Sequence, residues 1–259
     1  MRSLPAVGRL RGKTASGRLR LWDAMCRLLY ADACARGLVD VGIGERADTT
    51  VELLRWTDGP VVALEVHPVR VEQARMRLAG LPVQVLETDA LKGATDGPRG
   101  GLLRCANVLR QYPVSVVDSA HAALLSWVDD AGVVLEGSCD KAGHVGAMHI
   151  LEKDLAGPVR RALVFVTDFQ RGFAPIQLRD HLPCDLRREV RAGGCMADFF
   201  ARWMQAWRDH RTGDPATDFR RAAEAMGGDV EVHAFSAADG GGAALLWRPP
   251  GGVPRPEPA

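Results

Sequence analysis

The sequence has little lysine and no excess of charge of either sign. Its 33 basic residues are almost all arginine, and 32 acidic residues bring the formal net charge to +1. Proteins that bind nucleic acids non-specifically usually carry a clear basic excess. A general nucleic-acid-binding function is therefore disfavoured. The shortage of lysine is typical of a GC-rich genome, so a single arginine is weak evidence for function.

The chain also lacks paired cysteines and long apolar runs. None of its six cysteines belongs to a Cys-x-x-Cys pair or lies at zinc-ligand spacing from a histidine, so no metal site is expected. No apolar run approaches the ~20 residues that span a bilayer. The basic N-terminus is not followed by the apolar core of a signal peptide. These absences predict a soluble, cytoplasmic protein with reduced, mostly buried thiols.

What the sequence does contain is an alternation of apolar strands and amphipathic helices. Strands are expected in five apolar segments, each bounded by turn residues: 37–42, 60–66, 82–90, 101–109 and 132–138. Helices are expected between them, from a cap at Thr49 or Thr50 to about Trp56, over 68–79 and over 114–128. The alternation predicts an α/β, Rossmann-like fold with a mostly parallel central sheet and helices on both faces.

The pattern changes in the second half of the chain. Residues 145–151 and 160–169 read as two strands joined in a hairpin, and 170–228 as a helical elaboration. Two more strands near the C-terminus either complete the main sheet or form an addition to it. The expected division is an N-terminal basic and helical segment (1–36), a main domain (37–250) and a flexible tail (251–259).

Two further patterns are interpreted as structural. His144 and His149 have no acidic residue at a useful sequence spacing, so both are expected to be core or surface histidines. An aromatic stripe at helical spacing favours core packing over a lid above a substrate. Its members are Phe199, Phe200, Trp203 and Trp207.

The candidate site begins in the segment "LVDVGIGERADTT" (38–50). In an open parallel sheet, ligands bind beyond the carboxyl ends of the strands, where glycines let the backbone approach a ligand closely. Polar or glycine residues occur at the expected ends of the first four strands. They are Asp40, Gly42 and Gly44 after the first strand, Glu65 after the second, Asp89 after the third and Asn107 after the fourth.

Two nucleotide cofactors compete for this arrangement. Gly42, Gly44 and Ala47 match the dinucleotide fingerprint G-x-G-x-x-A, with Glu65 about 20 residues beyond it. Against that reading, Asp40 stands where dinucleotide-binding folds usually keep an apolar strand residue. An NAD-dependent oxidoreductase therefore remains one alternative.

The acidic-x-Gly-x-Gly motif, followed by an acid after each of the next two strands, resembles the class I S-adenosylmethionine-dependent methyltransferases. The resemblance covers roughly residues 37 to 169. One departure is Arg46, which follows Glu45 where the family often has a third glycine. The segments "RGKTASGRLRLWD", "EVHPVRVEQA" and "RCANVLRQYP" also resemble a group of actinobacterial methyltransferase-like proteins.

The resemblance implies S-adenosyl-L-methionine as cofactor and a role for each residue. Asp40 and the amides of Gly42 and Gly44 would position the methionine part. Glu65 would hold the ribose, Asp89 the adenine amino group, and Asn107 would face the sulfonium and the substrate. A catalytically inactive binding or regulatory protein is a second alternative.

The reaction is less constrained by the sequence than the cofactor. The Asn/Asp-Pro-Pro-aromatic motif of many exocyclic-amine methyltransferases is absent, since "NVLRQYP" stands in its place, so nucleobase amines are disfavoured as acceptors. The expected partner is a small-molecule or unknown methyl acceptor. The sequence singles out no catalytic residue and leaves the oligomeric state open.

The N-terminus adds a hypothesis about closure of the site. Six cations precede Asp23, the first acidic residue of the chain. Such a cluster repels itself unless an anion lies nearby. We expect "RGKTASGRLR" (11–20) to fold over the crevice, the alternative being a solvated basic tail. The residues that could then contact the cofactor carboxylate or an anionic substrate group are Arg11, Lys13, Arg18 and Arg20.

Overall fold

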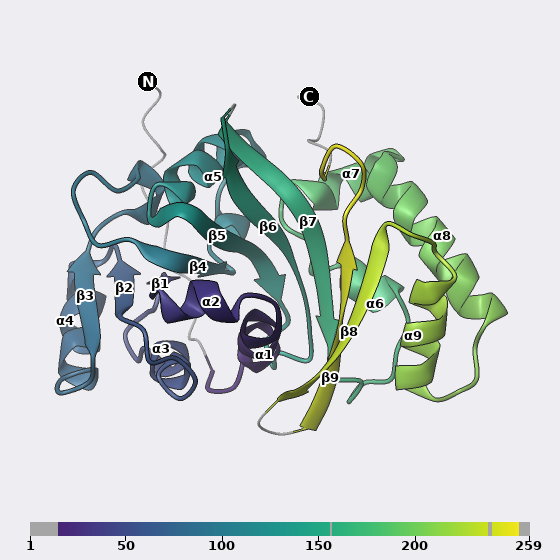
Figure 1. Cartoon of the computed structure of the whole chain (residues 1–259), viewed down its shortest axis with the longest axis horizontal. Helices are drawn as coiled ribbons and strands as arrows, with labels where there is room; N and C mark the ends of the chain where they lie inside the picture. The colour runs from purple at the N-terminus through teal and green to yellow at the C-terminus, as the bar shows by residue number, and fades with distance from the viewer. Residues whose placement is uncertain (1–14, 156, 238–239, 254–259) are drawn as a thin grey trace.

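The computed structural model describes residues 15–155, 157–237 and 240–253. They form one continuous sheet with helices packed against it (Figure 1). Its nine strands are β1 (Leu38–Val41), β2 (Val61–Glu65), β3 (Val83–Glu87), β4 (Gly100–Ala106), β5 (Val128–Cys139), β6 (Val145–Asp154), β7 (Gly157–Thr167), β8 (Val230–Ala237) and β9 (Gly240–Trp247). They lie in the order β3-β2-β1-β4-β5-β6-β7-β9-β8. The two C-terminal strands therefore complete the main sheet.

The sheet has two halves with different pairing. The four pairings from β3 to β5 are parallel, and the four from β5 to β8 are antiparallel. The predicted mostly parallel sheet is therefore wrong for the second half. Five residues separate β5 from β6, and two separate β6 from β7. Such short connections can only reverse the chain, because a parallel pair needs a crossover of a dozen or more residues.

Four helices cover one face of the sheet, namely α1 (Arg20–Leu29), α2 (Ala31–Ala35), α3 (Asp48–Leu53) and α4 (Pro68–Arg77). In α1, Leu21, Trp22 and Met25 follow helical spacing and are buried against the strands. Pro68 occupies the first turn of α4, where its fixed φ and missing N–H carry no penalty. These helices fix the side of the sheet from which the N-terminal segment reaches the strand ends.

The opposite face carries α5 (Val117–Leu125), α6 (Ile176–Arg179), α7 (Leu186–Ala192), α8 (Cys195–Asp209) and α9 (Pro215–Glu224). Figure 1 shows α6–α9 grouped beside the antiparallel half. Phe165 of β7 packs against Phe199, Phe200 and Trp203, while Trp247 of β9 contacts Phe199 with its ring tilted by 37°. The aromatic stripe is thus core packing, as expected, with Trp207 at its partly buried edge.

The element boundaries mostly follow the sequence-based expectation, with one clear error near the site. Thr49 and Thr50 do not cap α3 but lie inside it, both buried, and the cap is Ala47 in a left-handed conformation with φ +48°. At the C-terminus, Val253 is 5% exposed and donates to the Arg160 carbonyl at 2.8 Å. The remainder of the expected tail, 254–259, lies outside the described residues.

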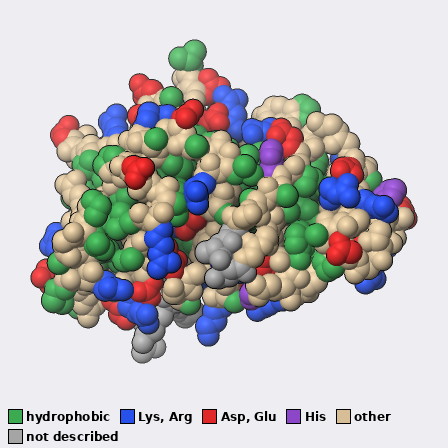
Figure 2. Space-filling model, turned by 60° about the horizontal axis from the view of Figure 1, so that its bottom comes forward, with side chains coloured by type: hydrophobic (Ala, Val, Ile, Leu, Met, Phe, Trp, Pro, Cys, Tyr) green, Lys and Arg blue, Asp and Glu red, His purple; other side chains and the backbone are tan. Residues whose placement is uncertain are grey.

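Two surface properties complete the description. In the described part of the chain, no helix combines the length and the apolar character needed to cross a bilayer. Figure 2 shows basic and acidic side chains interspersed over the face that it displays, as expected for a formal net charge of +1. That face therefore presents no extended field of one sign.

Candidate functional site

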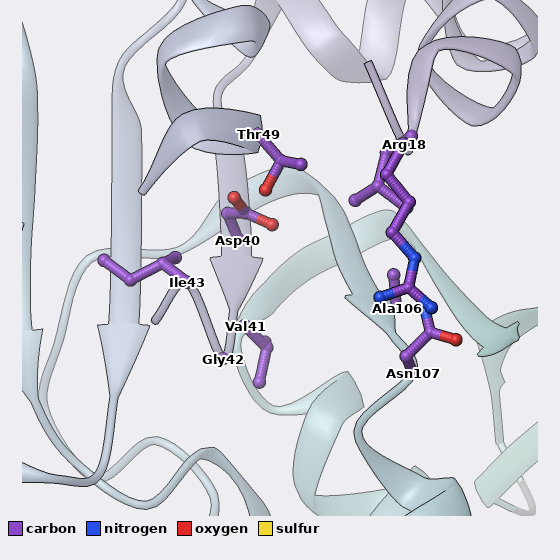
Figure 3. Close-up of a pocket in the computed structure, with 9 residues that line it drawn as sticks. Arg18, Asp40, Val41, Gly42, Ile43, Thr49, Ala106 and Asn107 are labelled. Carbon is purple, nitrogen blue, oxygen red and sulfur yellow. The ribbon is translucent and has the colours of Figure 1, made fainter. Parts of the chain in front are cut away.

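A pocket lies where the strand order changes direction, between the carboxyl ends of β1 and β4. It holds about 330 Å³ of space, including its open mouth. Figure 3 shows Arg18 reaching across it from the N-terminal segment toward Asn107, opposite Asp40 and Gly42. Such a reversal point is where ligands bind in open α/β sheets. The lining residues are Arg18, Leu19, Asp40, Val41, Gly42, Ile43, Thr49, Ala106 and Asn107.

The carboxylate of Asp40 lines this pocket but is already fully engaged by the protein. It accepts hydrogen bonds from Thr50 Oγ1 at 2.7 Å and from Arg104 Nε and Nη2 at 3.0 and 2.9 Å. Arg104 Nη1 also pairs with Asp23 of α1. Burial opposes the charge of Arg104, but Asp23 and Asp40 outweigh that effect and raise the pKa of the guanidinium. Burial also raises the pKa of Asp23 to about 6. The triad Asp23–Arg104–Asp40 thus joins α1, β1 and β4.

Glu65 ends β2 and is bound to the glycine loop. Its Oε2 accepts from the Gly44 amide at 3.0 Å, and its Oε1 accepts from the amides of Val66 and His67 at 3.0 and 3.1 Å. The side chain is 4% exposed. Gly44 has φ +70°, and a Cβ built on it would meet no other atom within 4 Å. A ligand could therefore approach the Gly44 backbone directly.

Asp89 and Tyr112 lie farther along the same edge. Asp89 caps the short helix η1 (Ala90–Lys92) by accepting from the Leu91 amide at 3.1 Å. No described residue donates to its other carboxylate oxygen. Tyr112 follows the short helix η2 (Leu109–Gln111). Its ring packs against the core cluster that includes Val41 and Leu109, and burial raises the pKa of its phenol.

Asn107 holds the ends of β4 and β5 together. It adopts a left-handed conformation with φ +61°. Its Oδ1 accepts from the Cys139 amide at 3.2 Å, and its Nδ2 donates to Cys139 Sγ at 3.2 Å. Burial raises the pKa of the Cys139 thiol, so it serves as a neutral partner for the amide.

The predicted cationic segment is described only from residue 15 onward, so Arg11 and Lys13 lie outside the described residues. Arg18 donates from Nε to the Asp140 carbonyl at 3.0 Å and from Nη2 to the Cys139 carbonyl at 3.3 Å. The Gly17 amide is held by Glu52 at 2.7 Å. A Cβ on Gly143 would lie 2.1 Å from the Arg18 carbonyl oxygen, so this turn must be glycine for the segment to dock. Residues 15–20 therefore lie across the strand ends.

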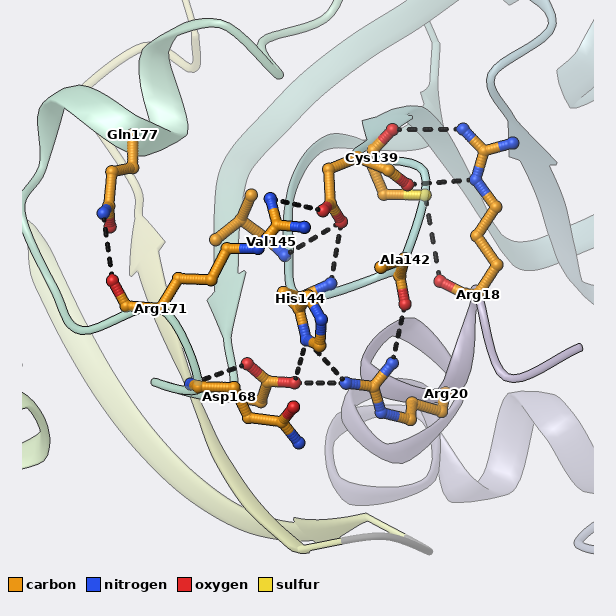
Figure 4. A network of polar contacts seen from close by, with 11 residues as sticks. Arg18, Arg20, Cys139, Ala142, His144, Val145, Asp168, Arg171 and Gln177 are labelled. Atoms are coloured by element: carbon orange, nitrogen blue, oxygen red, sulfur yellow. Dashed lines mark hydrogen bonds and ion pairs between the residues drawn. The ribbon is translucent and has the colours of Figure 1, made fainter. Parts of the chain in front are cut away.

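Figure 4 shows Arg18 and Arg20 in one polar network, in which Arg20 has other direct partners than Arg18. Its Nη2 pairs with Asp168 and lies 3.2 Å from His144 Nδ1, while Nη1 donates to the Ala142 carbonyl at 3.0 Å. His144 Nδ1 is 2.8 Å from Asp168 Oδ2. This network ties the start of α1 to the β5–β6 turn and the end of β7. Arg20 is thus directed away from the pocket.

A second buried polar cluster lies on the opposite face, beneath α5 and α7. His149 Nε2 is 3.1 Å from Asp185 Oδ2, and His121 Nε2 is 3.5 Å from Glu136 Oε2. Burial raises the pKa of Glu136 to about 8, although His149 opposes the shift. His149 is a core histidine, as expected, and His144 is half-buried, but each has an acidic partner that its sequence neighbours did not indicate. Asp168 and Asp185 are distant in sequence and reach them only through the fold.

The pocket thus brings together Asp40, Gly42, Asn107 and Arg18, while Gly44, Glu65 and Asp89 continue along the neighbouring strand ends. Sequence reasoning missed two residues of this edge, Arg104 and Tyr112. An arginine in the otherwise apolar strand "GLLRCA" was the available signal for Arg104. No comparable signal marked Tyr112, because it follows the short helix η2, which the sequence pattern did not predict.

No family model and no curated protein matches the chain. The structure is similar at low sequence identity to several solved structures. The N-methyltransferase NodS from Bradyrhizobium japonicum, in complex with S-adenosyl-L-homocysteine, is 13% identical, with 91% of this chain and 89% of that chain covered and a TM-score of 0.40. DesVI from Streptomyces venezuelae is 14% identical, with coverages of 90% and 93% and a TM-score of 0.39.

The CcbJ methyltransferase from Streptomyces caelestis is 14% identical, with 62% of this chain and 70% of that chain covered and a TM-score of 0.39. Similarity at this level leaves the activity of the present chain to be inferred from the residues of its own site.

Proposed function

We propose that this chain is an S-adenosylmethionine-dependent methyltransferase that acts on a small molecule. The observation that carries the proposal is the alignment of cofactor-type groups along the carboxyl ends of four adjacent strands. In the order β3-β2-β1-β4 these groups are Asp89, Glu65, the Gly42–Gly44 loop and Asn107. The pocket at the reversal point lies in the same row.

The residues present fit the chemical groups of this cofactor. Glu65 can accept from the ribose hydroxyls, and Asp89 can accept from the adenine amino group. The open space at Gly44 leaves room for close backbone contact. Arg18 lines the pocket and has no carboxylate within ion-pair distance among the described residues, so it can pair with the methionine carboxylate.

Asp40 takes a less direct role in this proposal than its motif implies. Its charge is compensated by the Arg104 guanidinium, which donates to both of its oxygens, and Oδ2 also accepts from Thr50, whereas Glu65 is held by backbone amides. We assign it as a positioning residue that fixes the pocket floor through Arg104. Direct contact with the methionine part falls to the amides of Gly42 and Gly44 and to Arg18.

When bound, the cofactor supplies an electrophilic methyl group on a sulfonium with a good leaving group. The protein then has to align acceptor and methyl group, and alignment alone can supply about 7–11 kcal/mol of a reaction barrier. Asn107 is placed for this purpose, because its left-handed backbone and its bonds to Cys139 fix it between β4 and β5. The proposal therefore assigns Asn107 to alignment and assigns no residue as a base.

The alternative of a dinucleotide cofactor fits the loop less well. In such folds the pyrophosphate lies at the N-terminus of the helix that follows the glycines. Here that helix, α3, begins with Asp48, whose carboxylate is 2.9 Å from Arg46 Nε. Asp48 thus neutralises Arg46, the cation beside this helix N-terminus, and removes it as a partner for a pyrophosphate. The loop therefore favours a cofactor without phosphate.

The test is ligand-induced stabilisation of the purified protein. S-adenosylhomocysteine at a hundredfold over its dissociation constant adds about 2.7 kcal/mol of stability. In a protein of this size that corresponds to a rise of roughly 5–10 °C in Tm. NAD at the same concentration should leave Tm unchanged. A clear rise with NAD and none with S-adenosylhomocysteine or S-adenosylmethionine would overturn the proposal.

A second measurement separates an enzyme from an inactive binding protein. The protein is incubated with methyl-labelled S-adenosylmethionine and a small-molecule extract, and label in new small molecules is counted. We expect label in at least one new compound, and none with heat-inactivated protein. Stabilisation by the cofactor without any labelled product would support the binding or regulatory alternative.

A further inference from the structure

Asn107 is the only asparagine of the chain, and its side chain lines the pocket at the end of β4 (Figure 3). Its Oδ1 accepts two hydrogen bonds, from the Cys139 amide at 3.2 Å and from Arg110 Nη1 at 3.1 Å. Its Nδ2 donates one, to Cys139 Sγ at 3.2 Å. An amide oxygen has two lone pairs, and an amide nitrogen carries two N–H groups. Within the described residues the oxygen is therefore fully used, and one N–H is left for a molecule in the pocket.

The orientation of this amide is fixed by the kinds of atom around it. The Cys139 amide and the Arg110 guanidinium can only donate, so they must face the oxygen of Asn107. The Cys139 thiol donates its own hydrogen to the Arg18 carbonyl at 3.9 Å, and its sulfur can then accept from Nδ2. The Asn107 carbonyl accepts from Gln111 Nε2 at 3.3 Å. Turning the amide over would set N–H groups against N–H groups, so Asn107 presents a hydrogen-bond donor to the pocket.

A donor at this point discriminates between methyl-accepting atoms. The nitrogen of a neutral amine has a single lone pair, which it must use to form the bond to the methyl group. It cannot accept from Asn107 at the same time. The oxygen of a carboxylate, phenolate or hydroxyl has at least two lone pairs, so it can accept from Nδ2 and still react. A substrate that leaves a polar group of its site unmatched is strongly rejected.

We infer that the methyl acceptor reacts through oxygen, in a carboxylate, phenol or hydroxyl group, and that Asn107 Nδ2 donates to this oxygen. The inference rests on the proposed function and names its acceptor class. One oxygen lone pair forms the O–CH₃ bond, while the C–S bond of the sulfonium breaks and its electron pair stays on sulfur. A carboxylate or phenolate loses its negative charge in this step, and a hydroxyl releases its proton to water.

Arg110 takes the part of a positioning residue in this arrangement. It belongs to η2, three residues after Asn107, and among the described residues it has no carboxylate within ion-pair distance. It acts on the acceptor through Asn107, by holding Oδ1 and so leaving the second N–H of Nδ2 available. The contact is a single N–H bond, so Arg110→Lys can preserve it, whereas Arg110→Met cannot.

The test identifies the methylated atom. The full chain is incubated with methyl-labelled S-adenosylmethionine and a small-molecule extract, and the labelled products are purified away from the cofactor and treated with hydriodic acid. Under mild conditions this acid releases O-methyl groups as volatile methyl iodide and leaves N-methyl and C-methyl groups in place. We expect most of the label in the volatile fraction. Alkaline hydrolysis of a second portion releases methanol from methyl esters alone, which separates a carboxylate acceptor from a phenol or hydroxyl.

Three variants and a matched control connect the product to Asn107. Asn107→Asp keeps the size of the side chain but has no N–H, and labelling should fall by about a hundredfold or more. Arg110→Met should lower the rate about tenfold, and Arg110→Lys should recover most of it. The control is Arg77→Met on α4, an exposed arginine at the other end of the sheet, which should label as the wild type does.

The single asparagine also permits a readout that does not depend on turnover. Protein labelled with ¹⁵N-asparagine gives one side-chain amide signal in NMR spectra, the pair of N–H resonances from Nδ2 of Asn107. Both resonances should shift in Arg110→Met and stay near their wild-type positions in Arg110→Lys and Arg77→Met. An unchanged pair in Arg110→Met shows that Arg110 does not hold this amide, and overturns the inference.

The outcomes separate this inference from the proposed function. Label that stays on nitrogen or carbon overturns the oxygen acceptor and leaves the proposed function standing. A Tm rise with S-adenosylhomocysteine but no labelled product supports the binding alternative and overturns the acceptor inference. Absence of both the Tm rise and a labelled product overturns the proposed function itself, together with the inference that rests on it.

Discussion

The two halves of the sheet have comparable burial but very different chemistry at their ends. In the parallel half, each strand is followed by its own crossover, so separate loops carrying Glu65, Asp89 and Asn107 meet along one edge. In the antiparallel half the chain reverses in short turns. Its polar end groups, such as His144 and Asp168, are bonded to one another and to Arg20.

This difference shows that the connections between strands decide where ligand-binding groups can gather at the end of the sheet. Parallel strands present all their carboxyl ends on the same side, whereas antiparallel neighbours alternate. The antiparallel half instead supplies a wall packed against the aromatic core of α8 and α9. We therefore expect changes in one half to alter ligand binding and changes in the other to alter stability alone.

The largest expected effect comes from Arg104→Met in the parallel half. Removing this guanidinium leaves Asp23 and Asp40 buried without a counter-charge, which costs about 3–5 kcal/mol of unfolding free energy. Urea denaturation measures the loss. The matched control is Arg161→Met in β7, whose ion pair with Glu152 is half-exposed and should cost about 1 kcal/mol or less. Equal losses in the two variants would contradict the assigned role of the triad.

Glu65→Ala should alter ligand binding more than any change in the antiparallel half. Charge-assisted hydrogen bonds to the ribose contribute about 1.5–3 kcal/mol, so the Kd for S-adenosylhomocysteine should rise roughly ten- to a hundredfold. Loss of three amide contacts should also lower Tm by a few degrees. Calorimetric titration measures the Kd. Glu87→Ala, at the exposed register partner of Glu65 on β3, is the control and should bind as the wild type does.

Phe199→Leu tests the converse in the antiparallel half. This ring stacks on Phe165 and contacts Trp247, and the smaller side chain should cost about 1–2 kcal/mol of stability. The Kd for S-adenosylhomocysteine, measured well below Tm, should stay within twofold of the wild-type value. A tenfold change in Kd would mean that the aromatic core is coupled to the cofactor site, and the contrast between the halves would fail.

Glu136→Gln probes β5, the strand shared by both halves. The pKa of Glu136 is raised to about 8, chiefly by burial, so the folded state favours its protonated form. The stability gained from this preference is lost as pH rises from the unfolded pKa toward 8. The slope is at most about 1.4 kcal/mol per pH unit. Urea denaturation at pH 6 and pH 8 should show a smaller decline for Glu136→Gln than for the wild type. Parallel declines would indicate that Glu136 is ionised throughout.

The sequence predicted the parallel half more accurately than the antiparallel half. Residues 37–109 contain apolar strands that end in glycine or acids, and these local signals place the strands and their loops. The hairpin of β6 and β7 was expected, but the antiparallel pairings of β5 with β6 and of β7 with β9 were not indicated by the sequence pattern. The partners of His149 and Asp40 were not predictable, because Asp185 and Arg104 reach them across the fold rather than along the chain.

The candidate site shows the same division. The positions of Gly42, Gly44, Glu65 and Asp89 at strand ends followed from hydrophobic patterning. The hydrogen bonds of the Asp40 carboxylate did not follow from this patterning. They depend on Arg104 and Thr50, whose side chains reach Asp40 only in the folded structure. Burial of an arginine can be suspected in an apolar strand, but its partners are set by packing.

The triad Asp23–Arg104–Asp40 has a consequence for how this protein can evolve. Its members lie on α1, β4 and β1, and replacing Arg104 alone leaves two buried carboxylates without a counter-charge. A change of Arg104 alone is therefore costly, whereas a concerted change of all three to apolar residues of similar volume can be neutral or stabilising. Across related sequences, loss of this arginine should therefore be accompanied by loss of both aspartates. Because α1 belongs to this unit, the start of the chain should be inherited with the cofactor loop and not exchanged independently of it.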